Sequence, residues 1–373
     1  MAKVYYIGYY TSKGNPNCFD VFPSINSKMD YIIDSIKNKK NSIEIFSLGE
    51  SNKFNFTKKQ IVDNYEKIYY VSSFAKTNYL YKILSRIWLL LQIVFFILFK
   101  VKRNSKVIVY HSYAIINAIK FSVFFKKITL IYEIEEIYKA AWNKGEKEIK
   151  KEIKKLSIAD KYIFVNDLMD KEFMFNKEFL ICYGSYKKNV IKPKIEKEVI
   201  NIVYAGFIGN YNSDVHLAID SIRYLSNKYF LKVIGYGSEK DINEMIKKIS
   251  KINNEYNEKR IQFDGLLSGN ELIDYYGKCD IGICTRLLDN KNSNYTFPSK
   301  VLVYLSNNLN VVASKIDCIV NSKIEECINF VDVLTPEGVA ETILNNKNLV
   351  DDQILESLDF NFREDLNTMI NDK

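Results

Sequence analysis

The stretch NSNYTFPSKVLVYLSNNLNVVAS, residues Asn292–Ser314, contains one complete step from loop to helix to strand. Pro298 favours the first turn of a helix, because its missing N–H would be unpaired there anyway. An apolar helical pattern follows, and then an Asn-rich turn and a short buried strand. Lys300 lies at the start of this helix, where backbone N–H groups and the helix dipole already carry positive charge. A bound anion would explain the cation, and an ordinary helix start with a solvated lysine is the alternative.

The same alternation of strands and helices occurs along the whole chain. In the first half, helical patterns separate apolar strand patterns such as KVYYIGYY (3–10), KVIVYHS (106–112) and ITLIYEIE (128–135). The alternation begins again with INIVYAGFIG (200–209), after the polar, basic and proline-containing segment 185–199. Such alternation predicts parallel sheets covered by helices on both faces. We therefore predict two doubly wound α/β domains, whose ligands bind at the carboxyl ends of the strands.

Length and composition agree with two folded domains. A chain of 373 residues is too long for one ordinary core. A hydrophobic content of 47% with 26% charged residues is typical of a folded, soluble protein. The six cysteines and two histidines show no zinc-ligand spacing, so reduced and mostly buried thiols are expected and no metal site is predicted. The strand-like start of the chain does not read as a secretory signal.

Basic residues are concentrated in one part of the chain. The net charge is +8, and the window from Lys76 to Lys127 holds ten Lys or Arg residues and no Asp or Glu. It encloses the apolar run Ile87–Phe99, whose 13 residues are too few to span hydrocarbon as a helix, which needs roughly 20. An apolar helix flanked by cations is typical of an anchor on anionic lipid, and a buried core helix is the alternative. Nucleic acid is less favoured, because the aromatic residues here do not alternate with the cations.

The block FPSKVLVYLSNNLNVVAS (297–314) resembles a motif of a known enzyme family. It is similar to the F-P-S-K-hydrophobic-hydrophobic-E-Y-L-A-x-G-x-P-V-V block of the retaining, GT-B-fold nucleotide-sugar glycosyltransferases, in particular the large family-4 type. Upstream, GYGSEKD (235–241) and RIQFDGLLSGNELIDYYGKCDIGI (260–283) are similar to that family's G-x-G and V-x-F-x-G segments. ITLIYEIEEIY (128–138) and LSIADKYIFVNDLM (156–169) resemble its acceptor-domain strands.

The resemblance covers nearly the whole chain and implies a fold. Two Rossmann-like, doubly wound parallel-sheet domains would face a cleft. The closing LDFNFREDLNTMI (358–370) resembles the family's terminal helix, which returns to pack on the first domain. The implied division is an acceptor-side domain over residues 1–190, a nucleotide-sugar-binding domain over 191–350 and the terminal helix over 351–373.

The resemblance also implies which residues bind the donor. Lys300 matches the phosphate-facing lysine of the block, and Arg286 is the candidate for a second phosphate cation, with a solvated loop arginine as its alternative. The other residues matched to diphosphate or nucleotide contacts are Gly14, Thr11, Gly206, Gly209, Gly235, Gly237, Gly265, Leu266, Phe297 and Ser299.

This sequence departs from the family pattern at two acidic positions. The paired glutamates of many members fall here on Tyr295 and Val303. A valine cannot accept a hydrogen bond from a ribose hydroxyl. We therefore expect Asn294 or Tyr295 to supply a neutral hydrogen bond in its place.

The resemblance implies a glycosyltransferase of the EC 2.4 type. It would transfer a sugar from a nucleoside-diphosphate sugar, expected to be a UDP-sugar, to a saccharide or glycolipid with retention, in surface polysaccharide biosynthesis. Lys300, Arg286 and helix amides would stabilise the leaving diphosphate without a metal or other cofactor. His111 would orient the acceptor or the sugar, with a core histidine as its alternative. Glu135 and Glu136 are expected to cap a helix and to contact acceptor hydroxyls.

Two other functions remain open. A sugar-nucleotide epimerase of the same fold would need Glu135, Glu136 and His111 as acid–base residues. A non-catalytic partner protein that keeps the fold is favoured by Val303. The expected partners are a nucleoside-diphosphate sugar, a saccharide or lipid-linked acceptor and an anionic membrane surface bound through residues 76–127, but no nucleic acid. The expected location is the cytoplasm, at the inner face of the plasma membrane.

Overall fold

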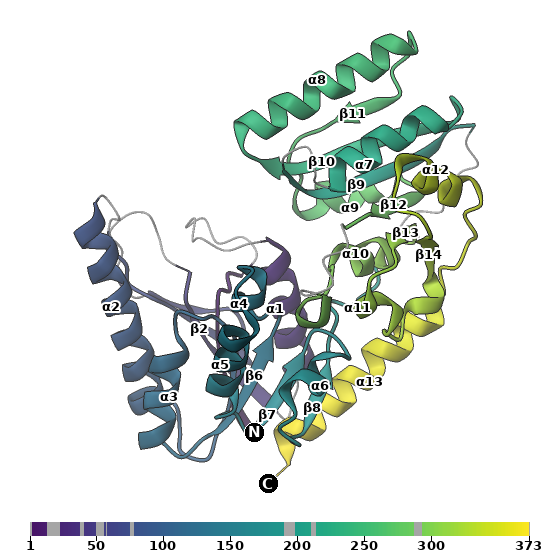
Figure 1. Cartoon of the computed structure of the whole chain (residues 1–373). Coiled ribbons are helices and arrows are strands. Elements are labelled where there is room, and N and C mark those ends of the chain that lie inside the picture. Colours follow the sequence, from purple (N-terminus) through teal and green to yellow (C-terminus); the bar gives the residue numbers. More distant parts are fainter. Residues whose placement is uncertain are drawn as a thin grey trace. The chain divides into compact units, whose positions relative to one another are not determined.

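The chain divides into two compact units in the computed structural model (Figure 1). The structure describes residues 2–12, 23–37, 41–49, 56, 58–74, 78–189, 198–209, 214–286 and 293–372. Unit 1 consists of Met1–Ser185, Asn294–Phe297 and Phe360–Lys373, and unit 2 consists of Tyr186–Ser293 and Pro298–Asp359. The main boundary after Ser185 lies close to the expected position 190. Residues 294–297, which the sequence assigns to the second domain, belong to unit 1.

Unit 1 is built on an eight-stranded sheet. Its strands are β1 (Ala2–Gly8), β2 (Asn41–Ser47), β3 (Lys58–Ile61), β4 (Glu66–Tyr70), β5 (Lys106–Tyr110), β6 (Thr129–Ile134), β7 (Lys161–Phe164) and β8 (Phe179–Ile181). They are arranged in the order β3-β4-β2-β1-β5-β6-β7-β8, and all neighbours are parallel except β3 and β4. The central strands are almost entirely buried, as their continuous apolar runs predict.

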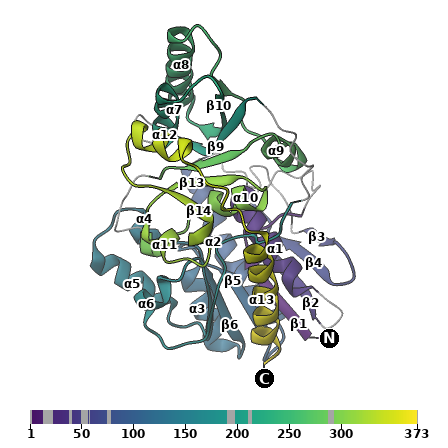
Figure 2. The same cartoon turned by 90° about the vertical axis from the view of Figure 1, so that its right-hand side faces the viewer.

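Helices cover this sheet. They are α1 (Pro23–Ile36), α2 (Tyr79–Phe95), α3 (Ile116–Phe125), α4 (Tyr138–Ala141), α5 (Glu146–Leu156) and α6 (Met169–Phe173). The last part of α13 (Asp352–Asn371) also packs on unit 1 (Figure 2). There Phe362 stacks on Tyr31 with ring centroids 5.6 Å apart, and Arg363 lies 3.4 Å from Asp34. The predicted return of the terminal helix to the first domain is therefore confirmed.

The helix α2 is longer than the 13-residue apolar run predicts. Asn78 caps its start by accepting a hydrogen bond from Tyr81 N at 3.0 Å. It continues without a break into a π-helical turn, η1 (Phe96–Lys100). The resulting helix Tyr79–Lys100 has 22 residues and is long and apolar enough to cross a membrane by length and composition. The prediction that this segment is too short to span a membrane is therefore wrong, and the packing of the helix has to distinguish a spanning helix from one that stays on unit 1.

Unit 2 is built on a six-stranded sheet whose paired strands are all parallel. Its strands are β9 (Ile200–Ile208), β10 (Tyr229–Gly237), β11 (Ile261–Phe263), β12 (Ile281–Cys284), β13 (Asn310–Ser314) and β14 (Ile328–Val331). The sheet order is β11-β10-β9-β12-β13-β14. From the first strand, β9, the chain continues to one side with β10 and to the other with β12, so the switch point lies between β9 and β12. Ligands of doubly wound sheets bind at such points.

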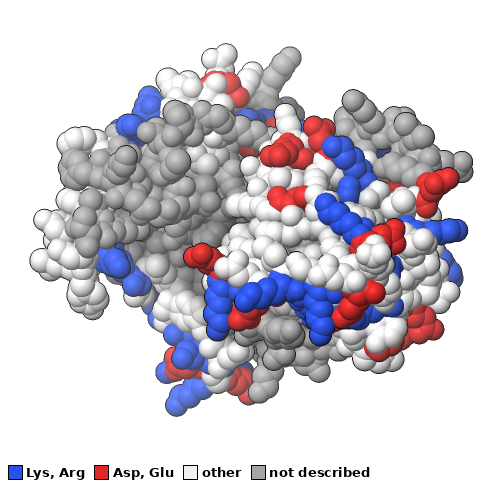
Figure 3. Space-filling view, turned by 90° about the horizontal axis from the view of Figure 1, so that it is seen from above, with Lys and Arg blue, Asp and Glu red and all other residues white. Residues whose placement is uncertain are grey.

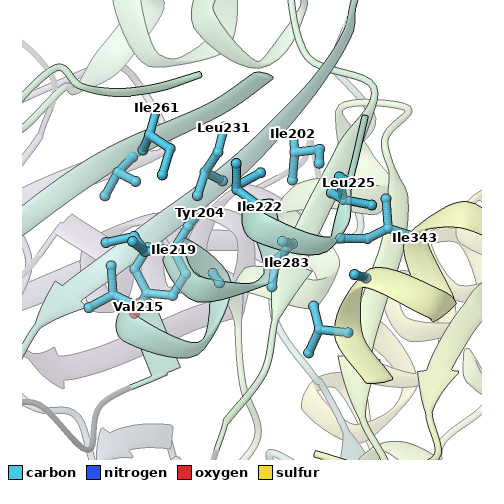
Figure 4. Close-up of a cluster of buried hydrophobic side chains, with 14 of the residues drawn as sticks. Ile202, Tyr204, Val215, Ile219, Ile222, Leu225, Leu231, Ile261, Ile283 and Ile343 are labelled. Carbon is cyan, nitrogen blue, oxygen red and sulfur yellow. The ribbon is translucent and has the colours of Figure 1, made fainter. Parts of the chain in front are cut away.

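Helices cover the second sheet and complete its core. They are α7 (Asp214–Ser221), α8 (Glu239–Glu255), α9 (Gly269–Tyr276), α10 (Lys300–Ser306), α11 (Asp317–Val320) and α12 (Pro336–Leu344), with short turns η2 (Ile222–Tyr224), η3 (Ser293–Tyr295) and η4 (Glu325–Cys327). Figure 4 shows apolar side chains of β9, α7 and η2 meeting in the interior of the unit. The two parallel-sheet α/β domains predicted from the sequence are thus confirmed.

Candidate active site

The amine of Lys300 lies at the carboxyl edge of the unit 2 sheet. Its Nζ is 2.9 Å from Asp214 Oδ2 and 4.2 Å from the centroid of the Tyr204 ring. A Cβ placed on Gly206, near the end of β9, would come within 3.1 Å of the same amine. The helix that carries Lys300 is tied to β9, because Ala205 N donates to Tyr304 Oη at 2.9 Å. Glycine at position 206 therefore leaves the space that the lysine side chain occupies.

Asp214, the first residue of α7, holds this lysine in place. Its Oδ1 accepts a hydrogen bond from Tyr204 Oη at 2.6 Å, while its Oδ2 pairs with Lys300. Burial alone would lower the pKa of Lys300, but the Asp214 carboxylate outweighs burial and holds that pKa above its ordinary value. Burial alone would raise the pKa of Asp214. The Lys300 charge and the hydrogen bond from Tyr204 outweigh burial, so the pKa of Asp214 is lowered. Both groups are charged at neutral pH.

The anion beside Lys300 in the structure is thus a carboxylate of the chain itself. The sequence-based candidates did not include Asp214. Its position as an acidic residue at a predicted helix start is a weak signal, since Asp is common there for reasons of helix stability. The helix α10 has only seven residues, and Val301 N already donates to Pro298 O at 3.0 Å. One first-turn N–H is therefore paired within the chain, and the expectation that the remaining amides and Lys300 bind a diphosphate stays a prediction.

The predicted glycines lie along the same edge of the sheet. Gly235 is close-packed against β9: a Cβ there would lie 1.9 Å from Gly206 O, and its φ is +151°. Gly237 has a similar approach to Ile208 O at 2.1 Å. Gly265, after β11, has φ +72° and accepts a hydrogen bond from Gly235 N at 2.8 Å. Strand packing therefore requires glycine at 235 and 237, whether or not a nucleotide approaches them.

Other predicted donor residues surround these strand ends in unit 2. Gly209 directly follows β9, and Leu266 is exposed after β11. Arg286 lies two residues after β12, is half-buried and is close enough to interact electrostatically with Cys284 and Cys318. Ser299 is exposed at the N-cap of α10, where its side chain makes no capping hydrogen bond.

Three predicted nucleotide contacts lie in unit 1 instead. Asn294 Nδ2 and Tyr295 Oη donate to Glu172 at 3.1 and 2.8 Å. Phe297 is buried and stacks on Tyr183 with ring centroids 4.9 Å apart. These contacts hold segment 294–297 on unit 1. The expectation that Asn294 or Tyr295 replaces a ribose-binding glutamate is therefore not supported, because Glu172 already engages both side chains.

His111 is a core residue of unit 1. Its side chain is 0% exposed, and Nε2 lies 2.8 Å from Glu152 Oε1. The same Glu152 accepts hydrogen bonds from Tyr138 N at 3.1 Å and Lys139 N at 2.8 Å. Burial lowers the pKa of His111, although Glu152 acts against this. The prediction that His111 orients a substrate is therefore wrong in this conformation, since a fully enclosed ring cannot contact one.

The two loop residues predicted after β1 are only partly described. Thr11 N donates to Asn26 Oδ1 at 2.8 Å, which fixes the backbone just beyond the strand. Thr11 Oγ1 is buried and has no hydrogen-bond partner among the described residues. Gly14 lies outside the described residues.

A buried acidic cluster lies near the carboxyl ends of β1 and β6. Glu133 is fully buried and accepts a hydrogen bond from Tyr6, while Lys28 pairs with Glu135. Burial and the neighbouring Glu135 carboxylate raise the pKa of Glu133 to about 8. Glu135 is thus paired with Lys28, and the expectation that it caps a helix and contacts acceptor hydroxyls is not supported.

The raised pKa of Glu133 predicts a pH dependence of stability. In the folded state this group keeps its proton up to about pH 8, whereas in the unfolded chain it loses it near its ordinary value. Between the ordinary value of 4.5 and about pH 8, the folded state therefore binds more protons than the unfolded chain. The free energy of unfolding should fall as pH rises through this window, by up to about 1.4 kcal/mol per pH unit. Urea unfolding of unit 1, followed by the fluorescence of Trp88 and Trp142, measures this slope. The slope should become shallower in Glu133→Gln, which removes this group's contribution, and an unchanged slope would contradict the assignment.

The described residues contain no group of three or more His, Cys, Asp or Glu side chains that could hold a metal ion. No protein-family model and no curated protein sequence matches the chain.

Solved structures match the chain over nearly its whole length. A UDP-forming α,α-trehalose-phosphate synthase from Burkholderia xenovorans in complex with glucose-6-phosphate has a TM-score of 0.68 at 10% identity, covering 99% of this chain and 98% of that one. An E. coli structure named for trehalose-6-phosphate and bound with UDP-2-fluoro glucose has a TM-score of 0.66 at 10% identity, with coverages of 98% and 95%. The sucrose-phosphate synthase of Thermosynechococcus elongatus has a TM-score of 0.65 at 11% identity, with coverages of 100% and 95%. At this low identity the likeness shows the fold alone, which is the GT-B architecture.

Proposed function

We propose that this GT-B-fold chain is a glycosyltransferase that uses a nucleoside-diphosphate sugar as its donor. The observation that carries the proposal is the charged amine of Lys300 at the switch point between β9 and β12, beside Gly206. Structures of the same fold are named as UDP-forming synthases, and one is bound with a UDP-sugar analogue. A diphosphate at this edge would meet the charged Lys300 amine, whose positive charge Asp214 partly offsets, in a half-buried position where electrostatic attraction is stronger than in water.

The reaction follows from where charge develops. The bond between the sugar C1 and the diphosphate oxygen breaks, and its electron pair remains on the leaving phosphate. The acceptor oxygen forms the new bond to C1, and its proton passes to the leaving phosphate on the same side of the sugar, which gives retention. Lys300 stabilises the leaving oxygens, with Arg286 as a second cation. The lysine keeps its proton throughout, because its pKa is raised. This scheme assigns no step to a metal or to any other cofactor.

The acceptor in this proposal is a saccharide or a lipid-linked saccharide, and the donor base is uracil. The reaction would extend a surface polysaccharide at the inner, cytoplasmic face of the plasma membrane. An epimerase is less favoured, because its acid–base candidates His111 and Glu135 are enclosed or paired. The second candidate is a non-catalytic partner protein. It is favoured by Val303 and by the engagement of Asn294 and Tyr295 with Glu172.

Thermal stabilisation by nucleotides separates a nucleotide-binding enzyme from the non-catalytic partner, and donor consumption separates a transferase from an epimerase. UDP or a UDP-sugar at about 100 times its dissociation constant should stabilise the protein by about 2.7 kcal/mol. Uridine alone should have a much smaller effect, since Lys300 would bind the diphosphate. No stabilisation by UDP, GDP, ADP, CDP or TDP would favour the non-catalytic partner. For a transferase, the donor is consumed faster when a saccharide acceptor is added, whereas an epimerase converts the donor alone.

A further inference from the structure

The helices α2 and α3 present large apolar side chains to solvent on unit 1. On α2, exposed residues recur every three or four positions at Leu80, Leu84, Ile87, Leu91 and Phe95. On the neighbouring α3, Phe124 is 84% exposed. Figure 1 shows the two helices next to each other at one side of the unit 1 sheet. Solvent-exposed apolar surface of this extent is uncommon in a soluble monomer and marks an interaction site. We call it the α2–α3 face.

The opposite side of α2 is fixed to unit 1. Leu89 and Ile93 of α2 and Phe96 of η1 are buried, and Phe96 stacks on Phe46 of β2 with ring centroids 4.5 Å apart. The spacing of these residues places them about half a turn away from the exposed stripe. If the helix spanned a bilayer, it would have to leave these contacts and uncover the core of unit 1. Because one side of the helix is packed and the other is exposed, we favour a helix that stays on unit 1 and presents its exposed side to a partner.

The charged side chains of the chain segment that forms the α2–α3 face are all positive. Between residues 78 and 127 the exposed charged side chains are Lys82, Arg86, Lys100, Lys102, Arg103, Lys120 and Lys127. The window contains no Asp or Glu. By contrast, Lys and Arg lie beside Asp and Glu where charged side chains gather on the face shown in Figure 3. A second copy of this chain would bring the same cations against each other, which disfavours self-association. Apolar side chains flanked by cations fit the surface of an anionic bilayer.

We infer that the α2–α3 face binds an anionic lipid surface, with α2 lying in the plane of the interface. The apolar side chains of α2 and α3 enter the acyl boundary, and the lysine and arginine side chains extend to the lipid phosphates. This inference does not require glycosyl transfer. If that function holds, the same face brings unit 1 to a lipid-linked acceptor.

Flotation with phospholipid vesicles tests the inference without any activity measurement. The full chain is mixed with phosphatidylcholine vesicles, with or without about 30% phosphatidylglycerol. Binding should require the anionic lipid and be largely reversed by about 1 M salt, which screens exposed charges within about 3 Å. A spanning helix would remain bound in high salt, and that outcome would overturn the in-plane arrangement. Equal binding to neutral and anionic vesicles, or none, would overturn the lipid surface itself.

Matched variants locate the binding. Ile87→Ser with Phe95→Ser removes two half-exposed apolar side chains and should weaken partition about 100-fold, near tenfold for each. Arg86→Gln with Lys120→Gln should weaken it about 30-fold on anionic vesicles. Ile246→Ser with Lys247→Gln, exposed on α8 of unit 2, is the control and should bind like the wild type. Sedimentation of the wild type should show a monomer. A dimer dispersed by Ile87→Ser with Phe95→Ser would instead identify a second copy as the occupant.

Discussion

Replacing Lys300 with alanine is expected to lower the turnover of the donor sugar about 100-fold, the typical effect of one preorganised transition-state contact. The charged amine lies 2.9 Å from Asp214 and beside the end of β9, where the leaving diphosphate would collect negative charge. Alanine removes that charge and keeps the helix start intact. The initial rate of nucleoside-diphosphate release in the presence of acceptor measures the effect. An unchanged rate would contradict the assignment of Lys300 to the leaving phosphate.

A loss of stability has to be separated from this loss of chemistry. Lys300→Ala leaves the Asp214 carboxylate without its partner in a position that is about a fifth exposed, which should cost about 1–3 kcal/mol. Adding Asp214→Asn relieves the unpaired charge and should recover most of the stability. Turnover should nevertheless stay low, because the cation is still missing. Recovery of turnover in the double variant would show that the lysine acts only through folding.

Unit 2 contains a matched lysine for comparison. Lys248 on α8 pairs with Asp220, and that aspartate lies on α7 like Asp214. Lys248→Ala breaks a similar ion pair within the same unit. It should lower stability by a similar or smaller amount and leave turnover within about twofold, because its partner Asp220 lies six residues beyond Asp214 on α7. Equal losses of turnover in both lysine variants would mean that any broken ion pair of α7 produces the effect.

Replacing Gly235 with alanine is expected to destabilise unit 2 by about 4 kcal/mol, which is in the range of the most damaging single changes. Its Cβ would lie 1.9 Å from Gly206 O, a backbone atom of the neighbouring strand that cannot move aside. The backbone at 235 also has φ +151°, which alanine rarely adopts. Urea unfolding followed by circular dichroism measures the loss. Trp88 and Trp142 both belong to unit 1, so their fluorescence reports that unit separately.

Two other glycines separate the two causes of this destabilisation, the steric overlap of the Cβ and the backbone strain. Gly265 has φ +72° with open space around its Cβ position, so Gly265→Ala should show backbone strain alone, about 1–2 kcal/mol. Gly145 has open space and an ordinary φ at the N-cap of α5, so Gly145→Ala should cost below about 1 kcal/mol. The expected order of destabilisation is 235, then 265, then 145. If Gly235→Ala were no worse than Gly265→Ala, the β9–β10 approach would not be the reason for glycine.

Most of the fold was predictable because most strands of the two sheets are local apolar patterns; the exposed, antiparallel β3 (KKQI) has no such pattern and was not predicted. The strand KVYYIGYY, for example, is buried almost throughout, and its apolar run can be recognised without any knowledge of its neighbours. Helix length was harder to predict. The apolar run Ile87–Phe99 already reaches the π-helical turn, but the helix begins at Tyr79, eight residues earlier, where the Asn78 cap sets its start.

The site was predictable only in part. Lys300 and the glycines at positions 206 and 235 could be found, because a short motif or a strand end marks each of them. Asp214 was missed, because its pairing with Lys300 joins residues 86 positions apart, which no local pattern contains. His111 was misassigned for the same reason. Its partner Glu152 lies 41 positions away on α5, and only packing shows that the pair is enclosed.

The sequence alone determined the alternation of strands and helices, the lysine at the start of α10 and the acid-free basic window. These depend on residue spacing and on charge, which are properties of neighbouring positions. Only the tertiary structure decided which side of α2 is exposed, that Asp214 faces Lys300 and that Asn294 and Tyr295 bind Glu172 in unit 1. Those outcomes depend on which distant segments pack together, because the residues packed against a charged or apolar side chain decide whether it is paired, buried or exposed.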